Sequence, residues 1–250
     1  MSLAINNPVV DIIVPVFNER DNLPELLTRL RALPDYERFH LIFVDNASTD
    51  GSVEFIQSVA NASVILHTHN RGYGASLRSG IAAARTEQIV IIDADCEYPP
   101  ECIPALLCAL VDHNVVYASR LRGKSTAREA GMLPLKWWGN RIISTAYNIL
   151  FTQHTTDLYT GCKALRRSCL NNIQLQRDGF EQVLELAAKL AACGYRIAEV
   201  PVDFSPRARG QSKMAHLSET LKYFFWLVFY RLQLSPSSSA AVQEAERGKQ

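Results

Sequence analysis

The stretch IVIIDADCEYPP, Ile89–Pro100, joins four apolar, β-forming residues directly to two aspartates, Asp93 and Asp95, that lie one residue apart. Short runs of Ile and Val are typical of buried strands. A strand inside a core has no use for two neighbouring carboxylates. We therefore expect Asp93 and Asp95 to act just beyond the end of the strand, at the edge of a sheet.

Strand-like and helix-like segments alternate on both sides of this stretch. Apolar runs predict strands at Val10–Val16, His40–Asp45, Ser63–His67, Ile89–Asp93 and Asn114–Ser119. Apolar residues at helical spacing predict helices at Asn22–Leu33, Asp50–Ala60, Gly74–Arg85, Glu101–Asp112 and Gly179–Tyr195. Strands that are apolar throughout and separated by helices are typical of parallel sheets covered on both faces. The sequence thus predicts an α/β protein with one mostly parallel sheet flanked by helices.

Polar residues follow three of the predicted strands. Asn18 and Glu19 come after the first strand, Asp45 ends the second, and Asp93 and Asp95 end the fourth. Ligands of open parallel sheets bind beyond the carboxyl ends of the strands. We therefore expect these side chains to share one rim and to form a binding site there, rather than solvated turns.

The spacing of the two aspartates suits a divalent cation. Two carboxylates at a strand end can share one hard ion, and Mg²⁺ commonly completes its shell with substrate phosphate and water. Glu97 follows two residues later and is a further candidate ligand. The sequence predicts Mg²⁺ or Mn²⁺ bound by Asp93, Asp95 and Glu97, where the metal would neutralise a diphosphate leaving group.

Composition narrows the possible partners. The chain has 250 residues, 48% of them hydrophobic, and a formal net charge of +1. This balance argues against nucleic-acid binding driven by bulk charge, so any anion site must come from local clustering. The six cysteines show no CxxC spacing and indicate reduced thiols. The chain's start does not resemble a signal peptide, and no run approaches the roughly 20 apolar residues that cross a bilayer, so we expect a cytoplasmic location.

Several motifs, in order, resemble a known family. IVPVFNERDNL, FVDNASTDGS, NRGYGASLRSGIAAAR and IIDADCEYPPECIPAL are similar to the family 2 glycosyltransferases with the GT-A fold. ASRLRGK, DLYTGCKALRR, GFEQVLEL and EVPVDFSPRARGQSK resemble the branch that contains dolichyl-phosphate mannosyltransferases and bacterial polyprenyl-phosphate glycosyltransferases. The resemblance implies transfer of a sugar, with inversion, from a UDP- or GDP-sugar to a polyprenyl or dolichyl phosphate, at the cytoplasmic face of a membrane.

The resemblance also implies a donor site. In the family the matching residues hold the nucleoside, the diphosphate and the metal; here they are Pro15, Phe17, Glu19, Val44, Asp45, Asp93, Ala94 and Asp95. Two departures leave the preferred base open. The family often has Tyr at the position of Phe17, and it commonly has Asp-Asp-Gly-Ser where residues 45–48 read Asp-Asn-Ala-Ser.

Basic residues and one carboxylate of the second half complete the implied site. Arg120 matches an arginine that contacts the donor, while Arg207 and Lys213 match a closing pair of phosphate-binding cations. Asp157, in DLYTG, is either a general base for a hydroxyl acceptor or a partner that orients a cation. A phosphate acceptor needs no base, because its second pKa near ~6 leaves it ionised at neutral pH. Our catalytic candidates are Asp95, Asp157 and Arg120.

The carboxy-terminal region predicts an appendage to the catalytic domain. We expect three parts: a catalytic domain over residues 1–213, an amphipathic helix over 214–234 and a disordered, Ser-rich tail over 235–250. The helix is apolar all round near its end, between Lys222 and Arg231, which fits either an interfacial helix or burial in a core or dimer. Lys136–Phe151 joins basic, Trp and apolar residues and is a second candidate for membrane contact.

Two other functions remain open at this point. A family 2 enzyme acting on a sugar or protein hydroxyl would use Asp157 as its base. A non-catalytic relative would bind a nucleotide without turnover. A nucleotidyltransferase fits less well, because the glycine-rich basic loop that it needs after the first strand is replaced by Phe17-Asn18-Glu19.

Overall fold

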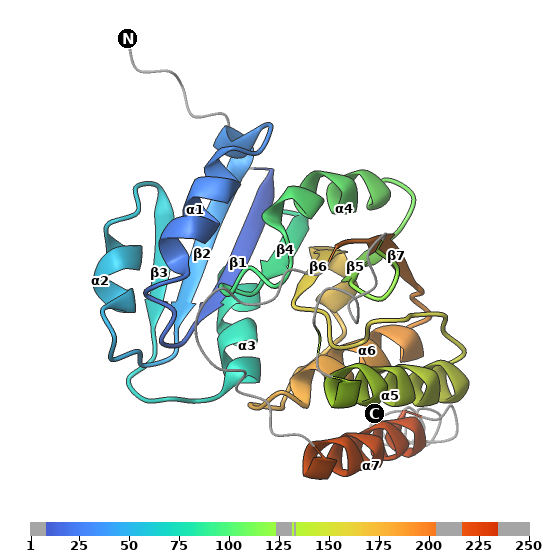
Figure 1. Cartoon of the computed structure of the whole chain (residues 1–250). Coiled ribbons are helices and arrows are strands. Elements are labelled where there is room, and N and C mark those ends of the chain that lie inside the picture. The colour runs from blue at the N-terminus through green and yellow to red at the C-terminus, as the bar shows by residue number, and fades with distance from the viewer. Residues whose placement is uncertain (1–8, 124–131, 133, 204–216, 235–250) are drawn as a thin grey trace, which may run out of the picture.

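The computed structural model of the chain describes residues 9–123, 132, 134–203 and 217–234. A seven-stranded sheet in the order β3-β2-β1-β4-β6-β5-β7 runs through them (Figure 1). The strands are β1 Val10–Val16, β2 Phe39–Asp45, β3 Ala62–Leu66, β4 Gln88–Ile92, β5 Val115–Ser119, β6 Cys162–Arg166 and β7 Ile197–Pro201. Among these strands only β6 is antiparallel to its neighbours, β4 and β5. The predicted mostly parallel sheet is thus confirmed.

The helices predicted from the sequence are present but shorter than expected, and the helix Pro134–Phe151 was not predicted as one. They are α1 Leu23–Arg31, α2 Ser52–Gln57, α3 Tyr73–Ala83, α4 Ile103–Ala109, α5 Pro134–Phe151, α6 Gln182–Ala192 and α7 Leu217–Gln233. Short 3₁₀ turns occupy η1 Tyr36–Arg38, η2 Pro100–Cys102 and η3 Arg167–Leu170. The helix predicted from Asp50 begins only at Ser52, because Gly51 has a left-handed φ of 89° that ends regular helical geometry.

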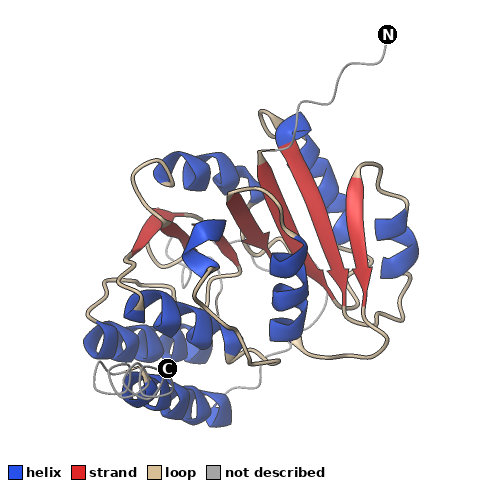
Figure 2. Cartoon of the chain, turned by 180° about the vertical axis from the view of Figure 1, so that it is seen from behind, coloured by secondary structure: helices blue, strands red, loops and turns tan. Residues whose placement is uncertain are grey.

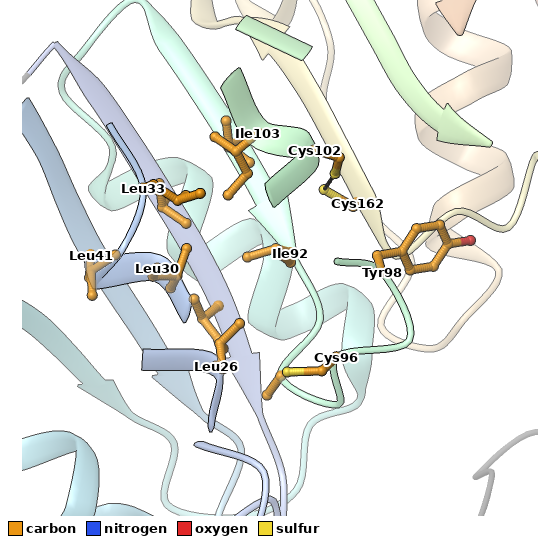
Figure 3. Packing of buried hydrophobic residues seen from close by; sticks show 14 of the residues in the cluster. Leu26, Leu30, Leu33, Leu41, Ile92, Cys96, Tyr98, Cys102, Ile103 and Cys162 are labelled. Atoms are coloured by element: carbon orange, nitrogen blue, oxygen red, sulfur yellow. Dashed lines mark hydrogen bonds between the residues drawn. The ribbon is translucent and has the colours of Figure 1, made fainter. Parts of the chain in front are cut away.

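Alternation along the strands divides the core into two layers. Ile92 packs with Leu26 and Leu30 of α1 and with Ile103 of α4 on one face (Figure 3). Ile91, the residue before it, faces the other layer, which α3, α5, α6 and α7 cover. Both faces are therefore buried, and each fully buried aliphatic side chain contributes about 1.5–3 kcal/mol of transfer free energy.

Three helices form a separate layer near the β6-β5-β7 end of the sheet. Figures 1 and 2 show α5, α6 and α7 gathered there, and α7 packs against both α5 and α6. The predicted C-terminal helix is present as α7, while residues 214–216 and the tail 235–250 lie outside the described residues. None of the helices in the described ranges is long and apolar enough to cross a membrane.

Candidate active site

The predicted rim is formed by parallel strands. β1 pairs with β2 on one side, with Val16 opposite Asp45, and with β4 on the other. All three strands run in one direction, so their carboxyl ends lie at the same edge of the sheet. The residues that follow β1, β2 and β4 are therefore brought to one edge, as the sequence predicted.

The loops after β1 and β2 are fastened to each other. The backbone N–H of Asn18 donates to Ser48 Oγ at 2.9 Å, and Thr49 N–H donates back to Asn18 Oδ1 at 2.8 Å. Glu19 N–H donates to Ser52 Oγ at 3.0 Å. Asn18 has a φ of 54°, a left-handed conformation that Asn tolerates better than most residues. These contacts hold the half-buried Phe17 and Glu19 beside the end of β2.

Asp45 is buried at that end and is incompletely satisfied. Its side chain is 1% exposed, and Oδ2 accepts from the N–H of Ser48 at 3.0 Å. Among the described residues its Oδ1 has no hydrogen-bond partner. A buried carboxylate oxygen without a donor is costly. A ligand that brings a donor, such as a ribose hydroxyl or a base N–H, would satisfy it.

Asn46 is an amide for a structural reason. Its Oδ1 accepts from Arg71 N–H at 2.9 Å and lies 3.0 Å from His67 Nδ1, while its Nδ2 donates to Asn70 Oδ1 at 2.8 Å. A carboxylate accepts only, so the aspartate common in the family would lose the contact with Asn70. Burial, and then the charge of Arg71, lower the pKa of His67. The contacts of both His67 ring nitrogens, with Asn46 and Ser79, indicate a packing role in this loop.

Asp93 is held from two directions. Its N–H donates to the carbonyl of Gly161 at 2.9 Å, and its Oδ1 accepts from the hydroxyl of Tyr73, the first residue of α3, at 2.8 Å. A Cβ at position 161 would overlap Asp93 Oδ2. Gly161 therefore leaves the room that this carboxylate occupies.

Asp95 and Glu97 are buried next to each other, but they face different partners. Asp95 Oδ1 accepts from the N–H of Glu97 at 3.0 Å. Glu97 Oε2 accepts from Arg120 Nη1 at 3.0 Å. Among the described residues no three His, Cys, Asp or Glu side chains are grouped as a metal site. The pair Asp93 and Asp95 still supplies two hard oxygen ligands, and Glu97 as a third ligand stays a prediction.

Arg120 and Asp157 form a buried, two-pronged ion pair. Arg120 Nε donates to Asp157 Oδ2 at 2.8 Å, and Nη2 donates to Oδ1 at 3.1 Å. The guanidinium lies over the ring of Tyr98, 4.4 Å from its centroid. Tyr98 also donates its hydroxyl to Asp157 Oδ2 at 3.0 Å, and Figure 3 shows that hydroxyl pointing away from the apolar cluster.

Asp157 is fully buried and well supplied with donors. Asn140 Nδ2 donates to Oδ1 at 2.5 Å, and the N–H of Arg120 donates to Oδ2 at 3.1 Å. Burial alone would raise the pKa of Asp157, but the charge and hydrogen bonds of Arg120 outweigh burial and lower the pKa below its usual value. This environment suits a permanent anion that orients Arg120, the second of the two roles considered for this residue.

Lys163 in β6 was not predicted to lie near the site. Its side chain is fully buried, with Nζ 5.3 Å from the ring centroid of Tyr117, and Nζ has no hydrogen-bond partner in the described part of the chain. Burial lowers the pKa of Lys163 to about 8, although the charge of Asp93 acts in the opposite direction. The sequence feature that could have indicated Lys163 was a lysine within the short apolar segment CKALR. Tyr73, Tyr98 and Gly161 gave no signal that sequence spacing could detect.

The remaining predicted residues differ in where they lie. Pro15 is half-buried and Ala94 is buried at the rim. Val44 has no exposed surface and packs in the core layer under α3, so a contact with the nucleoside would fall to its backbone. Arg207 and Lys213 lie outside the described residues.

Comparison with known proteins assigns the family. The profile of Glycosyl transferase family 2 matches residues 11–174, from the second residue of β1 to beyond η3. The chain belongs to this family. The matched region contains every predicted site residue except Arg207 and Lys213.

Relatives of this family 2 member are named for transfer to polyprenyl phosphates. The chain is 32% identical, over 82% of its length and 80% of the relative, to a dolichol-phosphate mannosyltransferase of Saccharomyces cerevisiae. It is 30% identical to an undecaprenyl-phosphate mannosyltransferase of Micrococcus luteus, covering 81% of this chain and 86% of the relative. It is also 30% identical to an undecaprenyl-phosphate 4-deoxy-4-formamido-L-arabinose transferase of Pseudomonas savastanoi, and spans 60% of that protein's length.

Solved structures confirm the GT-A fold for this family 2 chain. Glucosyl-3-phosphoglycerate synthase from Mycobacterium tuberculosis, in complex with UDP, aligns with a TM-score of 0.66 at 19% identity, over 90% of this chain and 80% of that one. A mannosyltransferase from Pyrobaculum calidifontis, in complex with GDP-Man and Mn²⁺, aligns with a TM-score of 0.58 at 19% identity, over 97% of this chain and 76% of that one. At these identities the likeness shows the fold alone.

Proposed function

We propose that this chain transfers a sugar, with inversion, from a nucleotide-diphosphate sugar to a polyprenyl phosphate. The observation that carries the proposal is the state of Asp157. Arg120, Tyr98 and Asn140 all donate hydrogen bonds to this carboxylate, so it is poorly suited to accept a proton. A hydroxyl acceptor would need such a base, whereas a phosphate acceptor does not. The names of the relatives support the same acceptor class.

The donor would bind along the rim from Asp45 to Asp93. The unsatisfied Oδ1 of Asp45 supports a role in accepting a hydrogen bond from the nucleoside. Asp93 and Asp95 offer the oxygen ligands that Mg²⁺ or Mn²⁺ accepts beside a diphosphate. When bound, such a metal would neutralise charge on the leaving nucleoside diphosphate. The Mn²⁺ bound by the mannosyltransferase from Pyrobaculum calidifontis supports this assignment.

Arg120 would contact the phosphate groups of the bound substrates. Burial would lower the pKa of Arg120, but Asp157 and the other nearby groups raise it, so the guanidinium keeps its charge. Bidentate pairing with Asp157 and stacking on Tyr98 fix its orientation before substrate arrives. A fixed cation in a site sheltered from water stabilises developing negative charge without reorganisation.

A polyprenyl phosphate would attack without help from a base. The acceptor is largely a dianion at neutral pH because its second pKa lies near ~6. The chain's task is then to place two anions within reach of each other and to screen their repulsion. One phosphate oxygen of the acceptor would form the new bond to the anomeric carbon while the bond to the nucleoside diphosphate breaks on the opposite side.

We further propose that the chain works at the cytoplasmic face of a membrane. α5 and α7 pack side by side, and both carry large exposed apolar side chains, among them Trp138, Ile142, Phe225 and Leu232. Their sequences hold four basic residues and one acidic residue. Aromatic, apolar and basic side chains together are typical of contact with anionic lipid headgroups.

The first test is calorimetric titration of UDP and GDP, with and without Mn²⁺. We expect one nucleotide to bind and Mn²⁺ to strengthen its binding. The matching nucleotide sugar is then incubated with undecaprenyl or dolichyl phosphate, and the lipid-linked sugar is measured. Turnover only with hydroxyl acceptors would contradict the proposed acceptor. Metal-dependent binding without turnover on any acceptor would support a non-catalytic relative, and no binding of any nucleotide would overturn the donor site.

A further inference from the structure

The inner face of α7 contacts a segment that leads to the active site. Arg177, which precedes α6, places its guanidinium 4.1 Å from the ring centroid of Trp226. Its Nε donates to the hydroxyl of Tyr230 at 3.2 Å. Tyr230 is buried, and Trp226 is half-buried between Arg177 and the helix layer. A guanidinium stacked on an indole and bonded to a buried hydroxyl fixes the distance between α7 and this segment.

The segment around Arg177 cannot move independently of α6. The buried carboxylate of Glu185 accepts from the backbone N–H of Gln176 at 2.9 Å and from that of Arg177 at 2.8 Å. Lys189 Nζ neutralises the same carboxylate at 2.7 Å. A displacement of α7 that moves Arg177 is therefore passed on to the backbone, rather than absorbed by a flexible loop.

That backbone lies directly against the start of α3. The carbonyl of Asp178 accepts from the N–H of Gly74 at 2.7 Å. A Cβ at Gly72 would overlap this carbonyl, and a Cβ at Gly74 would overlap the carbonyl of Arg177. The two glycines allow main chain to touch main chain on both sides of Tyr73. Tyr73 in turn donates to Asp93 Oδ1 at 2.8 Å and stacks on Phe180, 5.0 Å between centroids.

A second contact joins α7 to the other support of Asp93. The ring of Tyr223, buried on the inner face of α7, lies 5.2 Å from the ring of Tyr159. Tyr159 is two residues before Gly161, whose carbonyl accepts from Asp93 N–H. The Gly161 backbone therefore follows a residue that contacts α7 directly, while the Tyr73 hydroxyl is linked to α7 through the backbone of residues 177 and 178.

The outer face of the same helix is apolar and exposed. Phe225 is 61% exposed and Leu232 is 70% exposed. Lys222 and Arg231 are exposed at the two ends of this apolar stretch. The basic residues favour an anionic lipid surface over an uncharged or basic partner, and the aromatic residues suit the headgroup region.

We propose that α7 couples contact with an anionic lipid surface to the position of Asp93, through Arg177 on one side and Tyr159 on the other. Arg177 is a positioning residue and touches neither donor nor acceptor. The inference rests on the proposed function, because it needs Asp93 in the donor site. Small displacements matter there, since catalytic and binding geometry must hold within about 0.5 Å. Contact with the membrane, where the lipid acceptor is located, would thus bring Asp93 into the position that binds the donor.

The test measures nucleotide affinity in the presence of Mn²⁺, with and without vesicles of phosphatidylglycerol and phosphatidylcholine. We expect anionic vesicles to tighten nucleotide binding by the wild-type protein at least threefold. Arg177→Met keeps the outer face of α7 and should co-sediment with vesicles like the wild type, but its nucleotide affinity should no longer respond to them. Phe225→Ser should lose both co-sedimentation and the response.

Arg196→Met is the matched control, because Arg196 is exposed and donates to the carbonyl of Thr152 rather than to α7. It should keep the full response. If Arg177→Met does not fold, Trp226→Phe weakens the same stacking contact and replaces it. A response in Arg177→Met equal to that of the wild type would overturn the coupling, as would wild-type protein that never co-sediments. Nucleotide binding without any vesicle response would also overturn the coupling while leaving the proposed function intact, whereas no nucleotide binding at all would overturn the donor site itself.

Discussion

Arg120 donates from Nε and Nη2 to the two carboxylate oxygens of Asp157, and both side chains are almost wholly removed from solvent. Such a pair contributes little net stability, because desolvation offsets much of the attraction, but removal of one partner is costly. The arrangement holds a cation at the rim in one orientation. It also separates two roles that the sequence left open for Asp157, since a carboxylate bound by Arg120 has little basicity.

Asp157→Asn should impair both stability and catalysis. Leaving Arg120 buried beside a neutral amide should cost about 3–5 kcal/mol of unfolding free energy. Misplacement of the guanidinium should lower kcat/KM by roughly 10²-fold. Urea unfolding and steady-state kinetics measure the two effects. Arg120→Lys should show a similar kinetic loss, because a lysine ammonium cannot form the two parallel hydrogen bonds of a guanidinium.

The contribution of the Arg120–Asp157 pair to folding stability should decrease as pH falls. The pKa of Asp157 is lower in the folded chain than in the unfolded chain. Its stabilising contribution is therefore present above the unfolded pKa of about 3.9 and is lost as pH falls through the lower, folded value. Wild type should lose more stability on acidification below about pH 4 than Asp157→Asn. If Asp157→Asn lowers kcat/KM and Arg120→Lys does not, Asp157 would instead act as a general base.

Asp95→Ala should abolish metal-assisted binding of the donor nucleotide. The substitution removes one of two carboxylates that follow β4, and a single aspartate leaves a divalent ion poorly held. Calorimetric titration of UDP or GDP with Mn²⁺ measures this directly. Asp112→Ala, at an exposed position after α4, is the control and should bind like the wild type. Unchanged nucleotide affinity in Asp95→Ala would remove the metal from this site.

Gly161→Ala should weaken metal and nucleotide binding without a large loss of stability. The new methyl group would overlap Asp93 Oδ2 and push the carboxylate from its place. We expect nucleotide affinity in Mn²⁺ to fall about tenfold, equivalent to about 1.4 kcal/mol. Wild-type affinity in this variant would show that the position of Asp93 is not critical.

Gly194→Ala should lower stability and leave nucleotide affinity unchanged, the reverse of Gly161→Ala. Gly194 has a φ of 85°, and a Cβ there would meet no atom of the described residues within 4 Å. Its replacement should cost about 1–2 kcal/mol of stability from backbone strain alone. Nucleotide affinity should be unchanged, because the glycine follows α6 away from the rim.

Lys163→Met should stabilise the protein at neutral pH. Burial lowers the pKa of Lys163 from its usual 10.5 to about 8, so folding carries the full penalty of the buried charge below pH 8. By linkage this amounts to about 3 kcal/mol. Because the unfolded chain holds this proton up to higher pH, wild-type stability should rise relative to the variant between pH 8 and 10.5.

Urea unfolding at pH 7 and pH 10 measures that difference. Lys189→Met is the control, since Lys189 Nζ pairs with Glu185 at 2.7 Å and its loss should destabilise. If Lys163→Met were less stable than the wild type at pH 7, the Lys163 ammonium would have to be paired in solution.

Sequence patterns alone predicted the five strands β1 to β5 and the edge at which the candidate site lies, whereas β6 and β7 were not predicted. Runs such as VDIIVPV and IVII are buried on both faces because helices cover a parallel sheet, and that burial requires the continuous apolar runs that identify them. Parallel strands also have their carboxyl ends on one side. For this reason Asp45 and Asp93 could be assigned to one rim without knowledge of any distance. The family motifs added Arg120 and Asp157 as candidate members of the site.

The contacts among these residues depend on tertiary packing. β6 enters the sheet antiparallel between β4 and β5, and a five-residue strand carries too short a pattern to predict that position. Its insertion brings the segment from Asp157 to Gly161 to the rim, where Asp157 meets Arg120 and Gly161 meets Asp93. Tyr73 reaches Asp93 from another helix. These contacts join residues 20 to 68 positions apart along the chain, and their geometry follows from packing rather than from any local spacing.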